Sequence, residues 1–210
     1  SVLVPNLKGA ERALESGADA LLVPLSASHA HSLANLRKAP DEVVDEIAAI
    51  RAARDAAGSQ CLIEVGLSTA FGCTIQGRVE PAEVLRLMQA VLDAGVDRVG
   101  LADTVGYADP QQVRELFERG FALAGDKLAC GHFHDTRGLG LANVFAAWQQ
   151  GVARFDACLG GLGGCPHAPG ASGNASSEDL AFMLAAGGVH TGIDLRRLLA
   201  LRAQVAGWLE

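Results

Sequence analysis

Two histidines separated by one residue, His132 and His134, end a short apolar run that is typical of a β-strand. Because strand side chains alternate between two faces, we expect both imidazoles on the same face, where they can bind one ion. A pair of this kind also occurs as inert polar residues that simply hydrogen-bond at the end of a strand. Asp135 and Thr136 follow directly and are candidates for orienting the imidazoles. The spacing therefore predicts a candidate metal site.

Three further polar residues are candidates for the same site. Asp103 ends the preceding predicted strand, where it could take a proton, bind a ligand or cap the next turn; for an isolated carboxylate the cap is favoured. Asn174 offers a neutral carboxamide oxygen, and Glu178 either orients Asn174 or caps the helix that begins there. Two imidazoles with oxygen ligands and no thiolate cluster favour Mg²⁺ or Mn²⁺ over a closed zinc site.

A glycine-rich segment, 160–164, follows the last predicted strand, Phe155–Leu159, and includes Gly163 and Gly164. Glycines are entropically costly to order, and a loop that closes over a ligand is a reason to keep them. Cys165 comes directly after them and is a candidate reactive thiol, exposed when the loop is open and desolvated when it is closed. Three of the other thiols are expected to be small buried hydrophobes, namely Cys61, Cys130 and Cys158.

Composition excludes several classes of protein. The chain has 210 residues and a net charge of −7, from 17 basic and 24 acidic side chains, without a basic cluster. This balance argues against a nucleic-acid or anionic-membrane partner. No apolar run approaches the roughly 20 residues of a membrane span, and the first residues do not look like a signal peptide. Five cysteines at irregular spacings suggest free thiols, so we expect a cytoplasmic protein.

Short apolar runs alternate with helical patterns along the whole chain, which is typical of an α/β protein with a parallel sheet. The Gly-x-Gly-x-x-Gly turn of a dinucleotide-binding sheet is absent, and the polar residues follow several different strands, as in a barrel. Segment 26–38 is expected to be a loop, and Pro40 and Pro81 to open helices. We count six βα units, whereas a barrel has eight in about 250 residues. The prediction is a TIM (β/α)8-type barrel in which residues 1–210 form one domain with C-terminal helices, and whose first two βα units lie outside this sequence.

Two long motifs then closely resemble one family. They are similar to motifs of the 3-hydroxy-3-methylglutaryl-CoA (HMG-CoA) lyases, which are metal-dependent TIM barrels related to isopropylmalate synthase. The first motif is His132-Phe133-His134-Asp135-Thr136-Arg137-Gly138. The second is Gly161-Leu162-Gly163-Gly164-Cys165-Pro166, followed by Gly170-Ala171-Ser172-Gly173-Asn174. The resemblance begins at Pro5-Asn6-Leu7-Lys8-Gly9 and includes Asp103-Thr104-Val105-Gly106. It covers essentially all 210 residues.

The resemblance implies roles for individual residues. His132, His134 and Asn174 would bind a divalent cation, either Mg²⁺ or Mn²⁺. Cys165 would be a catalytic residue, and Asp103 would lie near the substrate. The implied reaction is a retro-Claisen cleavage of HMG-CoA to acetyl-CoA and acetoacetate, in which His132 or Asp103 accepts the hydroxyl proton and Cys165 protonates the enolate carbon. A homodimer or higher oligomer is also implied.

The chain departs from the lyase pattern at several points. The lyases begin with a strand that carries a metal-binding Asp and a catalytic Arg, which this sequence lacks, so weak or no activity is expected of this chain alone. Ser28-His29 stands where the lyases usually show Ser-Glu, and segment 71–77 also differs. A related substrate, such as citramalyl-CoA or a longer branched glutaryl-CoA, is therefore one alternative. An inactive barrel fragment with a structural or oligomeric role is the alternative from another class.

Overall fold

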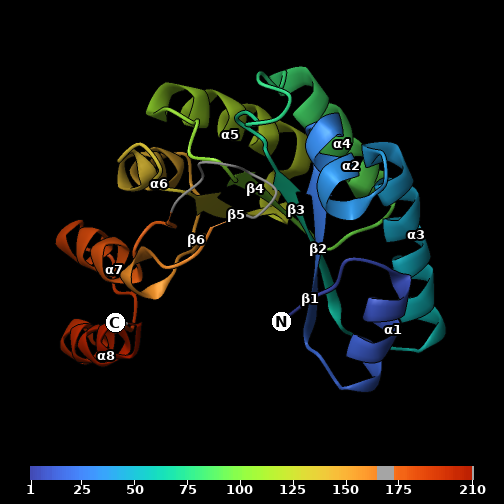
Figure 1. Cartoon of the computed structure of the whole chain (residues 1–210). Coiled ribbons are helices and arrows are strands. Elements are labelled where there is room, and N and C mark those ends of the chain that lie inside the picture. The colour runs from blue at the N-terminus through green and yellow to red at the C-terminus, as the bar shows by residue number, and fades with distance from the viewer. Residues whose placement is uncertain (165–172, 210) are drawn as a thin grey trace.

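The computed structural model describes residues 1–164 and 173–209. One sheet of six strands runs through the molecule, each strand is parallel to its neighbour, and the spatial order is the chain order. The strands are β1 (Val2–Leu3), β2 (Ala20–Ser26), β3 (Leu62–Ser68), β4 (Arg98–Asp103), β5 (Leu128–Phe133) and β6 (Arg154–Asp156). The sheet curls into a half-barrel (Figure 1), which confirms the predicted α/β barrel architecture.

Helices cover the convex side of this sheet, and two more extend beyond β6 (Figure 1). The covering helices follow their strands in order: α1 (Leu7–Glu15), α2 (His29–Leu36), α3 (Pro40–Ala56), α4 (Pro81–Asp93), α5 (Pro110–Ala124) and α6 (Gly140–Gln149). The chain continues beyond β6 with α7 (Ser177–Ala186) and α8 (Leu195–Leu209), and two 3₁₀ turns, η1 (Gly125–Lys127) and η2 (Leu159–Gly161), link elements. Pro40 and Pro81 stand at the first helical position, as the sequence predicted.

The hydrophobic core lies between the convex face of the sheet and these helices. Strand residues such as Leu21, Ile63 and Leu101 alternate outward and are fully buried against helical residues such as Ile47 and Leu87. The alternation fixes the register of the sheet, because a shift by one residue would turn this apolar set toward the concave face. It also fixes which side chains of each strand face inward.

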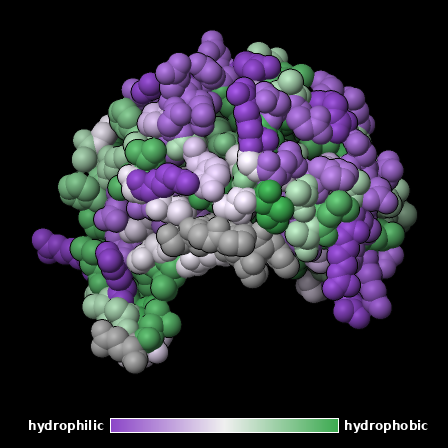
Figure 2. All heavy atoms as spheres, turned by 45° about the horizontal axis from the view of Figure 1, so that its top comes forward, coloured by the Kyte–Doolittle hydropathy of each residue, from purple (hydrophilic) through white to green (hydrophobic). Residues whose placement is uncertain are grey.

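The concave face carries the other half of each strand. Its middle is lined by small residues on β3, β4 and β5, which leave a cavity over the centre of the sheet. The cavity opens toward the hollow of the arch, whose overall shape is visible in Figure 2. Its polar and titratable lining residues are Glu64, Ser68, Thr104, Cys130, His132 and Asp156. Because parallel strands all end at the same edge, residues that follow β4, β5 and β6 are brought together.

Two local expectations were wrong. Segment 26–38 contains helix α2, because the Ser28 hydroxyl caps the amide of His31 and Arg37 ends the helix in a left-handed conformation. Strand β6 ends at Asp156, before the expected Leu159, and Cys158 instead forms an isolated bridge with Ser176. In the described residues, no helix has both the length and the apolar character that a membrane span requires.

Candidate active site

The end of β5 is joined to the segment around Asn174 by an antiparallel bridge between His134 and Asn174. The amide of Asp135 donates to the carbonyl of Gly173 (3.0 Å), and the amide of Ala175 donates to the carbonyl of Phe133 (2.9 Å). These bonds flank the bridge, so His134 and Asn174 form a non-hydrogen-bonded pair, the arrangement in which opposed side chains come closest. The imidazole and the carboxamide therefore lie side by side.

Both members of this pair carry a buried polar atom without a partner. His134 is 5% exposed and Asn174 7% exposed. Within the described part of the chain, neither His134 Nδ1 nor Asn174 Oδ1 has a hydrogen-bond partner. Buried polar atoms are normally satisfied, so two adjacent acceptors left open are a signal of a missing ligand. A hard divalent cation fits these donors, since imidazole nitrogen and amide oxygen both coordinate such ions.

His132 adds a second imidazole beside the pair. Its ring centroid lies 5.2 Å from that of His134, and its side chain is 30% exposed on the concave face. The prediction that both rings share one face is confirmed. Burial and the neighbouring His132 lower the pKa of His134 to about 4, which keeps the His134 imidazole neutral and able to coordinate. No group of three His, Cys, Asp or Glu side chains capable of holding a metal occurs in the described ranges, so Asn174 is essential to the candidate site.

Asp103 is fully buried at the end of β4 and is engaged by the loop that follows it. Its two carboxylate oxygens accept the amides of Tyr107 (2.8 Å) and Ala108 (3.1 Å). Burial raises the pKa of Asp103, and these amides oppose that rise. The carboxylate thus caps the turn, the role that spacing favoured, and it holds the loop whose Gly106 carbonyl accepts from Arg137 (2.9 Å).

Asp135 does not contact the imidazoles through its carboxylate, contrary to expectation. Its Oδ1 accepts the amide of Gly140 at 2.7 Å and so supports the first turn of α6. Because side chains alternate along an extended strand, Asp135 points away from the face that carries His132 and His134. The carboxylate that does approach an imidazole is Asp156 on β6, whose Oδ2 lies 3.5 Å from Nδ1 of His132.

The first part of the glycine-rich segment packs against Asn174. Asn174 donates through Nδ2 to the carbonyl of Leu162 (2.8 Å) and to the sulfur of Cys158 (3.2 Å). The amide of Asn174 donates to the carbonyl of Gly161 (2.8 Å). Gly163 has φ of 128°, and a Cβ at this position would lie 2.3 Å from Asn174 Nδ2. The glycine is therefore required by close packing that fixes which way the carboxamide oxygen points.

Glu178 neither contacts Asn174 nor provides the side-chain cap of α7, which Ser176 supplies. Its carboxylate is 2% exposed and accepts the amide of Gly160 (2.9 Å). The Glu178 carboxylate also accepts a hydrogen bond from the hydroxyl of Ser176 (3.1 Å) and forms an ion pair with Nε of Arg202 on α8 (3.1 Å). Glu178 therefore anchors the start of the glycine-rich segment, and it supports Asn174 only through that segment.

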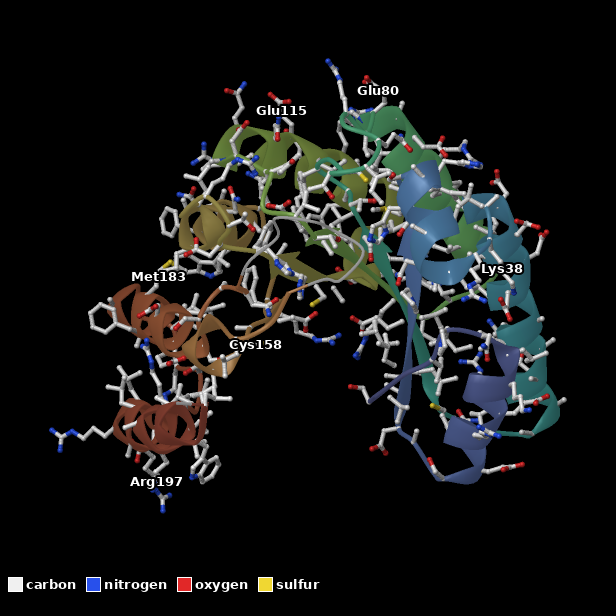
Figure 3. The ribbon with its side chains drawn as sticks, in the orientation of Figure 1. Lys38, Glu80, Glu115, Cys158, Met183 and Arg197 are labelled. Carbon is white, nitrogen blue, oxygen red and sulfur yellow. The ribbon has the colours of Figure 1, made fainter. Side chains whose placement is uncertain are left out.

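The thiols divide into two groups. Cys61 and Cys130 are buried, as expected, but Cys158 is only partly buried and contacts Asn174, so its expected role as a core residue was wrong. In Figure 3 Cys158 lies on the inner side of the arch. Burial raises the pKa of Cys130 to about 12, so this thiol stays protonated. Cys165 lies outside the described residues, and Gly164 is the last described residue before it.

The lowered pKa of His134 predicts that the metal-free protein loses stability in acid. The unfolded chain protonates this imidazole near 6.5, whereas the folded chain holds it neutral down to about 4. The unfolded state therefore binds more protons between these values, and stability rises with pH across that window. The stability lost through His134 on acidification across this window is on the order of 3 kcal/mol. Urea unfolding at several pH values should show a smaller slope for His134→Gln than for the parent.

The matched control for that experiment is His190→Gln, which changes an exposed histidine. This variant should keep the slope of the parent. If His134→Gln also keeps it, the imidazole is not held neutral by its surroundings.

Comparison with known proteins places the chain in a family. The family described as HMGL-like matches residues 1–205. "Hydroxymethylglutaryl-CoA lyase YngG" of Bacillus subtilis is 39% identical over 210 residues, covering 100% of this chain and 68% of that protein. "(R)-citramalyl-CoA lyase" of Chloroflexus aurantiacus is 40% identical over 212 residues, covering 100% of this chain and 64% of that protein.

A solved structure agrees with these relatives. The HMG-CoA lyase of Acinetobacter baumannii, in complex with coenzyme A and 3-methylmalate, is 43% identical and superposes with a TM-score of 0.92. The alignment covers 98% of this chain and 67% of that protein, so the chain spans about two thirds of the length of its relatives. On the match over residues 1–205 and on these relatives, the chain belongs to the HMGL-like family of carbon–carbon lyases.

Proposed function

We propose that this chain carries the cation site and most of the catalytic residues of a divalent-metal-dependent lyase that cleaves HMG-CoA to acetyl-CoA and acetoacetate. The observation that supports this most strongly is the bridge between His134 and Asn174, which places side by side two buried acceptor atoms that have no partner among the described residues. His132 lies next to them on the open concave face. The metal is proposed to be Mg²⁺ or Mn²⁺, because these ions accept nitrogen and oxygen ligands without thiolates.

In this proposal His132, His134 and Asn174 would hold the cation. When bound, a divalent ion lowers the pKa of a coordinated alcohol and stabilises the negative charge that develops on oxygen during the cleavage. The buried, neutral His134 keeps its nitrogen available for binding, and the contacts of Asn174 Nδ2 with Leu162 and Cys158 leave its oxygen free. The site is thus preorganised by the chain itself.

The remaining steps are proton transfers. Breaking the C2–C3 bond requires loss of the tertiary hydroxyl proton, and it releases acetoacetate together with the enolate of acetyl-CoA. His132 or Asp103 would accept the hydroxyl proton. His132 can do this only through a ring nitrogen that does not hold the cation, and both oxygens of Asp103 already accept backbone amides. Cys165 would give a proton to the enolate carbon, a role proposed from the resemblance alone.

Citramalyl-CoA is the second candidate substrate. The citramalyl-CoA lyase of Chloroflexus aurantiacus is as similar to this chain as the HMG-CoA lyase of Bacillus subtilis. The two segments that depart from the lyase pattern also contact each other: Gln76 accepts the hydroxyl of Ser28 (3.0 Å) and the amide of Ala30 (3.2 Å). They lie beyond the C-terminal ends of β2 and β3, where barrel enzymes set their specificity.

The test is thioester cleavage on a panel of HMG-CoA, citramalyl-CoA and a longer branched glutaryl-CoA, with EDTA and after restoring Mn²⁺. The proposal predicts weak cleavage at most, since the Asp and Arg of the lyases are missing from this sequence, and any cleavage should be abolished by EDTA and restored by Mn²⁺. His190→Gln should behave as the parent and His134→Ala should be inactive under all conditions. Cleavage that survives EDTA would contradict the metal role. A chain that binds no Mn²⁺ and cleaves none of the panel would favour the alternative of a structural or oligomeric barrel module.

The contact between Gly163 and Asn174 gives a separate prediction. Gly163→Ala should weaken Mn²⁺ binding by about tenfold, because the new methyl group would displace the carboxamide that supplies Oδ1. The matched control is Gly188→Ala, since Gly188 also has a positive φ (83°) but a Cβ at that position would meet no atom within 4 Å. Calorimetric titration of both variants separates the displaced ligand from backbone strain. Equal affinities in the two variants would show that Asn174 is not a ligand.

A further inference from the structure

We propose that Asp156 is a positioning residue: it accepts the Nδ1 proton of His132 and so leaves the unprotonated Nε2 nitrogen of that ring free to face the proposed cation. This inference rests on the proposed function, which makes no use of Asp156. It concerns a β6 residue that the sequence analysis did not single out.

The geometry begins with the register of the sheet. His132 on β5 and Asp156 on β6 are paired neighbours, and both side chains line the concave cavity. Nδ1 of His132 and Oδ2 of Asp156 are 3.5 Å apart. Hydrogen bonds of catalytic groups are often long in ligand-free proteins and shorten when ligands bind. Since a neutral imidazole carries one proton, an Nδ1–H that faces a carboxylate leaves Nε2 as the basic nitrogen.

The surroundings of Asp156 keep it charged and in place. Its pKa is lowered chiefly by the neighbouring His132, with smaller contributions from the thiol of Cys130 and the positive charge of Arg154. Arg154 lies two residues earlier on the same face of β6 and is itself held by Glu64 on β3, through bonds of 2.9 and 3.3 Å. This bidentate pair crosses the concave face and limits where Arg154 can move.

The exposure of Asp156 argues against a purely structural role. Its side chain is 54% exposed, and exposed ion pairs contribute little to folding stability. The carboxylates that do support the fold here are buried, as Asp103 and Glu178 are. What Asp156 does control is the proton position on the neighbouring ring. A carboxylate behind a histidine is also the usual arrangement that fixes its tautomer for a ligand.

The experiment measures that tautomer directly. Nitrogen NMR of the histidines in the metal-free chain at about pH 8.5, above the usual imidazole pKa, should show His132 as the Nδ1–H form, with the signal assigned from His132→Gln. In Asp156→Ala it should change to the Nε2–H form, which a free imidazole prefers. Asp45→Ala, on an exposed position of α3, is the matched control and should leave the signal unchanged.

Two further readouts separate positioning from folding. Asp156→Ala should bind Mn²⁺ about 10- to 100-fold more weakly than the parent, while its thermal midpoint stays that of the parent. If Asp156→Ala does not fold, Asp156→Asn gives the same comparison without loss of volume. An unchanged His132 tautomer in a folded variant would overturn the inference. A parent chain that binds no Mn²⁺ would instead contradict the proposed function, and the tautomer measurement would still decide the role of Asp156.

Discussion

The His134→Ala variant is expected to lose measurable Mn²⁺ binding and, with it, thioester cleavage. The substitution removes a buried nitrogen that has no other partner in the described residues. The remaining Asn174 oxygen and the partly exposed His132 would then be too few and too weakly oriented to retain the ion. Loss of a ligand from a site of this kind costs more than the 10- to 100-fold effect of removing a supporting residue. Calorimetry with Mn²⁺ on metal-free protein is the measurement.

A double-mutant cycle makes this prediction specific. If His134 and Asn174 share one ion, then Asn174→Ala should also abolish binding, and the double variant should be no worse than either single variant, because groups that act as a unit are not additive. His190→Ala, at an exposed position, controls for the loss of an imidazole and should bind as the parent does. Mn²⁺ affinity that survives His134→Ala would remove this residue from the site.

The Cys165→Ala variant is expected to lose turnover by about 10²- to 10⁴-fold, the usual contribution of a positioned acid or base. In the proposed mechanism its thiol delivers the proton that converts the enolate to acetyl-CoA. Among the described thiols, Cys61, Cys73 and Cys130 are buried, and Cys158 is held against Asn174. Thermal stability and Mn²⁺ affinity should both stay close to those of the parent.

The control for that variant is Cys61→Ala. Cys61 precedes β3 at the opposite end of the sheet from the candidate site, so its removal should leave kcat unchanged. Steady-state kinetics on the preferred thioester would decide the matter. A Cys165→Ala variant that turns over as fast as the parent would exclude the thiol from the chemistry.

Much of the fold could be predicted because the relevant signals are local. Alternating apolar runs and helical periods define the β-then-α units, and Asp109-Pro110 marks the start of α5 by cap chemistry that needs no tertiary contact. Helix α2 was missed because it is short and depends on Gln76, a residue far along the chain, which accepts from its first turn. The assignment of residues 1–210 to one domain stays a prediction.

The candidate site was predictable only in part, because some of its contacts join residues that are far apart in the sequence. The spacing of His132 and His134 places both on one face, but nothing in the sequence shows that Asn174 pairs with His134 across a bridge. Asp135 was expected to support the imidazoles because it is adjacent in sequence, whereas it is Asp156 on a neighbouring strand that approaches His132. Support of this kind is set by sheet register, which a single sequence does not display.

The central claim is that two imidazoles and one carboxamide meet at a single divalent ion. Crystals of the protein soaked in Mn²⁺ test it through the anomalous scattering of the metal. The account predicts one strong peak that lies about 2.2 Å from a nitrogen of His132, a nitrogen of His134 and the Oδ1 atom of Asn174. A peak bound elsewhere, or at only one of these side chains, would contradict it.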